Sequence, residues 1–246
     1  MQTVLGIDIG GSGIKGAPVD LEQGRFAAER VRVPTPDGAP PGPVADVVAQ
    51  VVSSFDTDGP FGCTFPAVVV NGVARTAANV DPAWIGTDVH ALLSKQTGRD
   101  AVVINDADAA GLAEVRYGAG RDRDGTIVVL TLGTGIGSAV FVDGHLVPNT
   151  ELGHLEIRGK TAEERASDRT RDDEDLGWHH WAQRLNEVLT TIERLLSPQL
   201  FILGGGVSKK SDNFLHLLST QAEIVPATLR NDAGIIGAAL VASGAR

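Results

Sequence analysis

The sequence predicts an α/β protein of two lobes, each built around one copy of a repeated unit. Each copy is an apolar strand, a glycine-rich turn and a returning strand, over residues 4–19 and again over residues 125–143. Asp8 aligns with Thr131, Ala17 with Val140 and Val19 with Val142, at one constant offset and without a gap. Self-similarity at half the chain length indicates a duplicated structural unit. A buried strand ending at Asn105 places polar groups where α/β sheets collect their ligands.

The N-terminal lobe is expected to span residues 1–104. Strands over 4–9, 14–19 and about 25–33 predict an antiparallel meander. Apolar residues then recur at helical spacing from Val44 to Phe55. Asn71-Gly72 between short apolar runs predicts a hairpin. A short helix over 88–97 is expected to lead into the central strand over 101–105.

The C-terminal lobe is expected to span residues 105–231, and the helix within 232–246 is expected to join the first lobe. A helix over 107–117 precedes the second repeat. The charged run 158–175 predicts a solvated surface segment, and 181–196 an amphipathic helix that ends before Pro198. A strand over 200–203 runs into Gly204–Gly206. Asn231-Asp232 predicts a cap for the last helix.

Composition restricts the class of protein. The chain of 246 residues has a formal charge of −10, which argues against extended binding to nucleic acid or to an anionic membrane. The single cysteine, Cys63, excludes an internal disulfide and a cysteine-cluster metal site. The first residues carry no basic leader, and no apolar run is long enough to span a bilayer. We expect a cytoplasmic protein that binds neither nucleic acid nor membrane.

The two glycine turns suit a polyphosphorylated ligand, because closely spaced backbone amides bind phosphate oxygens. Asp8 offers a carboxylate for Mg²⁺, expected to bind through water, and Lys15 offers a cation for phosphate. Gly205 and the following lysines either border the same ligand or form a simple strand–helix turn. The residues expected to bind the phosphate donor are Asp8, Gly10, Gly11, Ser12, Lys15, Thr131, Gly133, Thr134, Gly135, Gly205, Lys209 and Lys210.

Five short polar side chains suit sugar hydroxyls, because each accepts or donates hydrogen bonds in fixed directions. They are Asn105, Asp106, Glu151, His154 and Glu163. Glu151 and His154 are three residues apart, so they project to one side if that turn is helical. Two alternatives stay open: Asp106 caps the helix that follows it, and His154 is an ordinary structural histidine.

Six motifs of the chain resemble those of the sugar kinases of the ROK (repressor, open reading frame, kinase) family, in the actin-like ATPase superfamily. The motifs are Asp8–Lys15, Asn105–Gly111, Thr131–Gly137, Glu151–His154, Gly204–Ser208 and Asn231–Gly237. The resemblance implies a two-lobed actin-like ATPase (ribonuclease H-like) fold. It also implies that Asp106 is the catalytic base, that Asn105, Glu151 and His154 bind the sugar, and that the two glycine turns bind phosphate. Glu163 is implied as a further sugar ligand by the stretch Glu163–Ser167.

The chain departs from the family at one place. Most members carry a Cys-x-Cys-Gly-x-x-Gly-Cys zinc motif just before that glutamate, whereas residues 155–162 contain no cysteine. We therefore expect Mg²⁺ and no structural zinc. The zinc-free stretches 151–157, 206–210 and 225–230 resemble the polyphosphate glucokinases. That resemblance implies phosphorylation of glucose to glucose 6-phosphate by inorganic polyphosphate, with ATP as a further donor, in a homodimer.

A polymeric donor needs a basic track, and the candidates are Lys209, Lys210, Arg121, Arg123 and Arg75. The main alternative is an ATP-dependent ROK hexokinase that acts on glucose, fructose or an amino sugar. A catalytically silent sugar sensor is a second alternative. A ROK repressor needs a DNA-binding helix-turn-helix, for which a strand beginning at Thr3 leaves no room.

Overall fold

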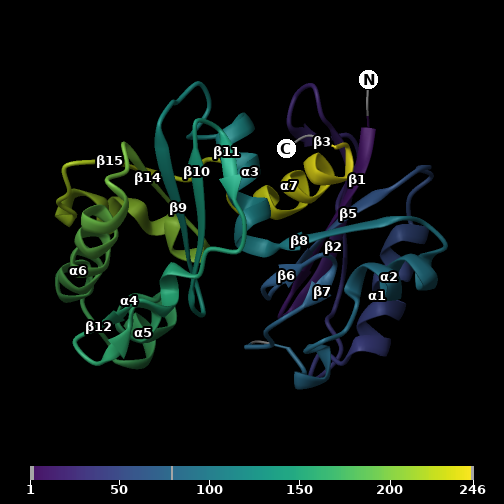
Figure 1. Cartoon of the computed structure of the whole chain (residues 1–246), viewed down its shortest axis with the longest axis horizontal. Helices are drawn as coiled ribbons and strands as arrows, with labels where there is room; N and C mark the ends of the chain where they lie inside the picture. Colours follow the sequence, from purple (N-terminus) through teal and green to yellow (C-terminus); the bar gives the residue numbers. More distant parts are fainter. Residues whose placement is uncertain (1–2, 79, 245–246) are drawn as a thin grey trace. The chain divides into compact units, whose positions relative to one another are not determined.

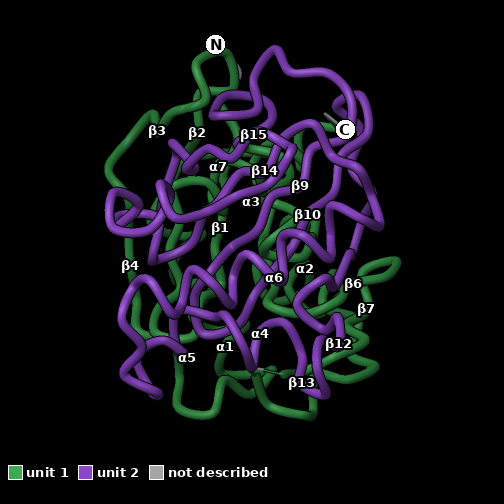
Figure 2. Tube along the Cα trace, turned by 90° about the vertical axis from the view of Figure 1, so that its left-hand side faces the viewer, with its two compact units in different colours: residues 1–113, 232–246 green, residues 114–231 purple. Residues whose placement is uncertain are grey.

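The computed structural model describes residues 3–78 and 80–244 and divides them into two compact units. Unit 1 comprises residues 1–113 and 232–246, and unit 2 comprises residues 114–231 (Figure 2). Unit 1 is therefore made from two separate stretches of chain, whereas unit 2 is one continuous stretch.

The sheet of unit 1 has the order β3-β2-β1-β5-β8, and β4 also pairs with β2. β1 runs antiparallel to β2 and parallel to β5, which is parallel to β8. The predicted third strand is two short strands, β3 and β4, which pair with different parts of β2. The strands are β1 Thr3–Gly10, β2 Gly13–Asp20, β3 Arg25–Phe26, β4 Val31–Val33, β5 Phe61–Phe65 and β8 Ala101–Asn105.

Helices cover both faces of this sheet (Figure 1). α1, Pro41–Ser53, and α2, Val89–Thr97, pack together on one face, while α7, Ala233–Ala242, crosses β1, β5 and β8 on the other. The hairpin of β6, Val69–Val70, and β7, Val73–Ala74, turns at Asn71 and Gly72, whose φ angles are 51° and 78°. Two positive φ angles suit the Asn-Gly pair and confirm the predicted hairpin. Pro82–Trp84 forms the short helix η1.

Glycines allow α7 to lie directly on the backbone of its neighbours. A Cβ on Gly6 of β1 would stand 2.0 Å from the carbonyl oxygen of Ile235, and one on Gly62 of β5 would stand 1.7 Å from that of Ala238. Likewise, a Cβ on Gly237 of α7 would stand 1.8 Å from the carbonyl oxygen of Ala109 in α3, Asp106–Tyr117. These contacts leave no room for any side chain, so α7 is fixed against the sheet by backbone proximity.

The sheet of unit 2 repeats the topology of the first, in the order β11-β10-β9-β14-β15. β9 and β10 form an antiparallel hairpin extended by β11, and β9, β14 and β15 are parallel. The repeat therefore covers a whole five-strand pattern and confirms the predicted duplication. The strands are β9 Thr126–Leu132, β10 Ile136–Val142, β11 His145–Val147, β14 Leu200–Gly204 and β15 Glu223–Pro226.

The gapless alignment of the two copies is wrong by one residue after the turn. Asp8 pairs with Lys15 across the first hairpin, whereas Thr131 pairs with Gly137 rather than with Ser138, the aligned match of Lys15. The cause is turn length, because Gly10 pairs with Gly13, whereas Leu132 pairs with Ile136. The second turn thus contains one more unpaired residue than the first.

Unit 2 is completed by helices around α6, Trp178–Leu196. α6 buries Trp181, Leu185, Leu189 and Ile192, as its amphipathic pattern predicts, while Leu195 is exposed. The charged run that predicted a plain surface segment instead contains two short helices, α4 and α5, and buries Ala162 and Ala166. The remaining elements are η2 Leu152–His154, β12 Glu156–Ile157, β13 Lys160–Thr161, α4 Ala162–Ala166, α5 Asp168–Asp173, η3 Gly206–Asn213, η4 Leu215–Leu217 and η5 Arg230–Asp232.

The units divide within α3, whereas the predicted boundary lies between residues 104 and 105. The start of α3 belongs to unit 1 because the Ala109 backbone packs on Gly237. Its end belongs to unit 2 because the buried Glu114 carboxylate accepts hydrogen bonds from the backbone N–H groups of Thr228 and Leu229, at 3.1 and 2.7 Å.

Asp232 begins α7 but makes no side-chain cap bond; its carboxylate instead accepts a hydrogen bond from Arg30. The capping predicted for Asp232 is therefore wrong. Within residues 3–78 and 80–244, no helix combines the length and the apolar character that crossing a bilayer requires.

Candidate functional site

In unit 1, the junction of β8 and α3 positions the carboxylate of Asp106. Oδ1 of Asn105 accepts hydrogen bonds from the backbone N–H groups of Ala107 and Asp108, at 2.9 and 3.0 Å. Nδ2 of Asn105 donates to the Ala67 carbonyl at 3.1 Å. The helix cap predicted as an alternative role for Asp106 is thus supplied by Asn105, which is buried.

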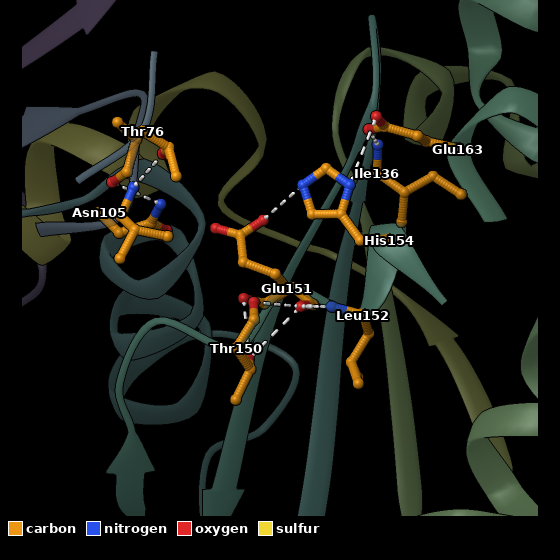
Figure 3. Close-up of polar contacts among 11 residues, drawn as sticks. Thr76, Asn105, Ile136, Thr150, Glu151, Leu152, His154 and Glu163 are labelled. Atoms are coloured by element: carbon orange, nitrogen blue, oxygen red, sulfur yellow. Dashed lines mark hydrogen bonds and ion pairs between the residues drawn. The ribbon is translucent and has the colours of Figure 1, made fainter. Parts of the chain in front are cut away.

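Asp106 is exposed, and its Oδ1 accepts a hydrogen bond from the N–H of Ala107 at 2.8 Å. The segment that accepts the Asn105 hydrogen bond at Ala67 is itself held in place, because the N–H of the next residue, Val68, donates to the Thr76 hydroxyl at 3.0 Å (Figure 3). Asn105 therefore fixes the backbone from which Asp106 projects. That Asn105 itself contacts the sugar stays a prediction. It would use the second N–H group of Nδ2, because the first donates to Ala67.

Asp8 and Lys15 face each other at the end of the first hairpin. Asp8 Oδ1 accepts from the Thr64 hydroxyl at 2.9 Å, and Oδ2 pairs with Lys15 Nζ at 3.2 Å. The Thr64 hydroxyl in turn accepts from Ile9 N–H at 3.1 Å. The carboxylate is thus oriented by β5 at the carboxyl end of β1, where a parallel sheet places ligand-binding groups.

The first glycine turn is held by side chains that the sequence did not single out. Thr35 donates to the Gly10 carbonyl at 2.5 Å, and the Arg32 guanidinium donates to the Ser12 carbonyl at 2.7 Å. Both come from the segment that begins with β4, which pairs with β2. Only that strand pairing brings Arg32 to the turn, so no local motif could have predicted it.

In unit 2, Glu151, His154 and Glu163 form a line of side chains (Figure 3). Nε2 of His154 lies 3.7 Å from Glu151, and Nδ1 lies 3.9 Å from Glu163. Burial raises the pKa of Glu151; His154 opposes that shift, and the Glu163 charge adds to it. The structure therefore brings three of the predicted sugar ligands together on one unit.

The Glu151 segment is attached to β10 through Ser138. The Ser138 hydroxyl donates to the Thr150 carbonyl at 2.5 Å and accepts from Leu152 N–H at 2.9 Å (Figure 3). Ser138 is buried, so this connection is shielded from water. It fixes the backbone on both sides of Glu151.

The second glycine turn contacts the same glutamate as His154. Oε2 of Glu163 accepts from Ile136 N–H at 3.3 Å and would lie 2.4 Å from a Cβ on Gly135. Arg169 N–H donates to the Gly133 carbonyl at 3.1 Å. One carboxylate therefore faces His154 through Oε1 and the turn through Oε2, which gives Glu163 a structural part beyond the predicted sugar contact.

The third glycine cluster packs against the end of β9. Gly205 has a φ of 82°, and a Cβ there would stand 2.3 Å from the Leu132 carbonyl oxygen. Lys210, in the helical turn that follows, lies over the Trp178 ring at 5.9 Å from its centroid. Lys209 and Lys210 are both exposed. The cluster thus stands next to the second turn within unit 2.

Two cations proposed for a basic track are already paired with carboxylates. Arg121 lies 3.5 Å from Asp122, and Arg123 lies 2.7 Å from Glu223. Such pairing lowers their value as ligands for a polyanion. Across residues 3–78 and 80–244, no cluster of three or more His, Cys, Asp or Glu side chains could hold a metal ion.

A family profile described as "ROK family" matches residues 4–170. The polyphosphate glucokinase of Mycobacterium tuberculosis (strain CDC 1551 / Oshkosh) is 51% identical over 237 residues, covering 96% of this chain and 89% of the relative. That of Mycobacterium leprae (strain TN) is 49% identical over 240 residues, covering 97% and 74%.

Among solved structures, the inorganic polyphosphate/ATP-glucomannokinase of Arthrobacter sp. strain KM superposes with a TM-score of 0.95 at 50% identity. The match covers 100% of both chains. It confirms the predicted actin-like ATPase fold. The chain belongs to the ROK family of sugar kinases.

Proposed function

We propose that this protein phosphorylates glucose at its 6-hydroxyl, with inorganic polyphosphate as the phosphoryl donor and ATP as a second donor. The observation that carries the proposal is the Asp106 carboxylate, exposed at the carboxyl end of β8 while Asn105 caps the helix. The relatives at about half identity over nearly the whole chain support both the acceptor and the donor.

Asp106 acts as the general base that accepts the proton of the sugar hydroxyl. Phosphoryl transfer asks little covalent chemistry of the protein, so most of the catalysis is alignment and charge stabilisation. Asn105 contributes by holding the first turn of α3, which fixes where the Asp106 carboxylate stands.

Glu151, His154 and Glu163 bind sugar hydroxyls. The two carboxylates accept hydrogen bonds, and the imidazole accepts or donates according to which ring nitrogen carries the proton. His154 is 56% exposed, and Glu151 and Glu163 are 36% and 34% exposed, so all three are open to a ligand. The alternative that His154 is only structural is weakened, because its ring nitrogens face these carboxylates and no buried backbone group.

The two glycine turns and Lys15 bind the phosphates of the donor. Asp8 fits Mg²⁺, because its hard oxygens are oriented by Thr64 and are partly exposed to water. When bound, the metal neutralises charge on the donor phosphates. Lys15, beside Asp8, would contact the phosphate as a cation. Because residues 155–162 contain no cysteine, we expect no structural zinc, and metal analysis of the purified protein should find no stoichiometric zinc.

The decisive experiment compares glucose phosphorylation with polyphosphate and with ATP under the same conditions. Activity with polyphosphate supports the proposal, and activity with ATP alone favours the ATP-dependent hexokinase acting on glucose, fructose or an amino sugar. Glucose binding without product from either donor indicates a sugar sensor. The Asp106→Asn protein is the matched control for contaminating kinases.

We also propose a cytoplasmic homodimer. The exposed Val142 and Val147, 46% and 44% accessible at the β10–β11 edge, supply apolar surface for a second copy. The free Cys63 suits a reducing compartment. Light scattering tests the oligomeric state, with a mass near 25.6 kDa contradicting the dimer.

A further inference from the structure

Arg32 stands at the first glycine turn and has no part in the function described so far. It lies on β4 directly opposite Lys15 of β2. Its Nη2 donates to the Ser12 carbonyl at 2.7 Å. The side chain therefore reaches across the sheet to the backbone of the turn.

The guanidinium lies on Gly13 itself. A Cβ on Gly13 would stand 2.6 Å from Nε of Arg32 and 2.9 Å from Cζ and Nη2. The guanidinium therefore occupies the space that a side chain at position 13 would need. Thr35 from the same segment holds the Gly10 carbonyl, so both carbonyl groups that flank the turn are bound by residues 32–35.

The charges at the turn are not balanced equally. Asp8 compensates Lys15 at 3.2 Å, whereas no described carboxylate pairs with Arg32. A guanidinium carries five N–H donors, and the Ser12 bond uses one of them. Arg32 is exposed, so its charge and its remaining donors face solvent. In a chain of net charge −10, an unpaired cation on a phosphate-binding turn favours an anionic ligand.

We propose that Arg32 is a further binding residue for the phosphoryl donor. The Ser12 bond holds the guanidinium in place, and its remaining N–H groups contact phosphate oxygens of the donor chain. Planar N–H pairs match phosphate geometry, which a lysine at this position could not reproduce. The inference rests on the proposed function, because it takes the turn to be a phosphate site.

The first test separates a ligand from a support for the turn. In Arg32→Gln the charge is lost, and the shorter side chain ends at about the position of the arginine Nε, so the bond from Nη2 to the Ser12 carbonyl is lost as well. We expect the KM for polyphosphate to rise about 10- to 100-fold, the range for losing a charge-assisted hydrogen bond, while the KM for glucose stays within about two-fold. Arg25→Gln, on β3 of the same sheet, is the matched control and should leave the KM for polyphosphate unchanged.

Gly13→Ala provides a second variant that leaves Arg32 in the chain. Gly13 has no positive φ angle, and the three atoms nearest to the new Cβ all belong to the guanidinium of Arg32, a side chain that can move aside, so the protein should fold. Because the guanidinium is displaced, the KM for polyphosphate should rise as in Arg32→Gln. The KM of the Gly13→Ala/Arg32→Gln double variant should be close to that of Arg32→Gln alone. Unchanged donor KM values in both single variants would overturn the proposal.

Calorimetry with tripolyphosphate distinguishes failure of this inference from failure of the proposed function. Weaker binding in Arg32→Gln than in the wild type supports the role of Arg32 even if no glucose is phosphorylated. Equal binding by both proteins, in an enzyme that is active with polyphosphate, would overturn the role of Arg32 alone.

Discussion

At the scale of single residues, the neighbours Asn105 and Asp106 have different tasks: one caps α3, and the other is proposed as the general base. Both are short polar residues at a strand end, and both can cap a helix. The structure gives the cap to Asn105, whose oxygen receives two backbone N–H groups. The cap therefore does not depend on Asp106, which we propose as the general base.

The Asp106→Asn variant tests this division. We expect kcat to fall by about 10²- to 10⁴-fold, the loss of a positioned general base, while glucose binding changes by only a few-fold. Turnover and calorimetric glucose affinity are the measurements. A folded variant with near-normal turnover would show that Asp106 is not the base.

Glu151 carries a prediction about pH. Its pKa in the folded protein is raised, mainly by burial, so the folded state holds this proton more tightly than the unfolded state. The contribution of Glu151 to stability is therefore greatest below the ordinary glutamate pKa and is lost as pH rises through the raised value. Glu151→Gln should raise Tm at neutral pH, and the gain should shrink toward zero as the pH falls below about 4.

Glu164→Gln is the control with the opposite sign. Hydrogen bonds from Thr161 lower the pKa of Glu164, so its carboxylate stabilises the fold at neutral pH and that stability is lost in acid. Thermal unfolding of both variants between about pH 3 and pH 8, a range that extends below the ordinary glutamate pKa, checks the two signs. A lower Tm for Glu151→Gln at neutral pH would contradict the first prediction.

At the scale of elements, local patterns predicted most strands and helices, because turn residues and apolar periodicity are local signals. The amphipathic face of α6 and the Asn71-Gly72 hairpin follow directly from them. The register of β9 and β10 could not be predicted in this way, because one more residue is left unpaired in the second turn, which shifts the pairing without changing the motif. The place of Arg32 depends on β4 pairing with β2, a contact between distant parts of the chain.

The contact of α7 with β5 gives a stability prediction. Gly62→Ala places a Cβ against the Ala238 backbone. No flexible side chain can move aside there, so the backbone of α7 itself has to shift. We expect a loss of about 1–3 kcal/mol, the range for overpacking, and a Tm lower by roughly 2–4 °C for each kcal/mol. Gly42→Ala in α1 meets nothing within 4 Å and should be neutral or stabilising. Equal Tm values for both variants would contradict this account of α7.

At the scale of the whole molecule, a negatively charged protein has to bind a polyanion through local positive charge. Lys209 and Lys210 are exposed candidates on unit 2, whereas Arg121 and Arg123 pair with Asp122 and Glu223. If the two glycine turns bind the donor phosphates, as proposed, only a long polymer extends beyond them. Cations outside them should therefore matter more for polyphosphate than for ATP.

Replacing Lys209 and Lys210 with alanine should lower kcat/KM for long polyphosphate more than for ATP. The difference should be largest at low ionic strength, since salt screens the attraction and competes for the cations. The Arg121→Ala/Arg123→Ala protein is the matched control and should lose less. Equal losses with both donors would instead place the two lysines at the common phosphate site.

The discontinuity of unit 1 also affects the order in which the protein is made. Residues 114–231 leave the ribosome as one uninterrupted segment and can fold as soon as they emerge. β1 and β5 emerge much earlier, yet the helix that lies on Gly6 and Gly62 is synthesised after all of unit 2. β1 is therefore covered by α7 only after all of unit 2 has been made, and until then the face that α7 covers is open to chaperones and to other nascent chains.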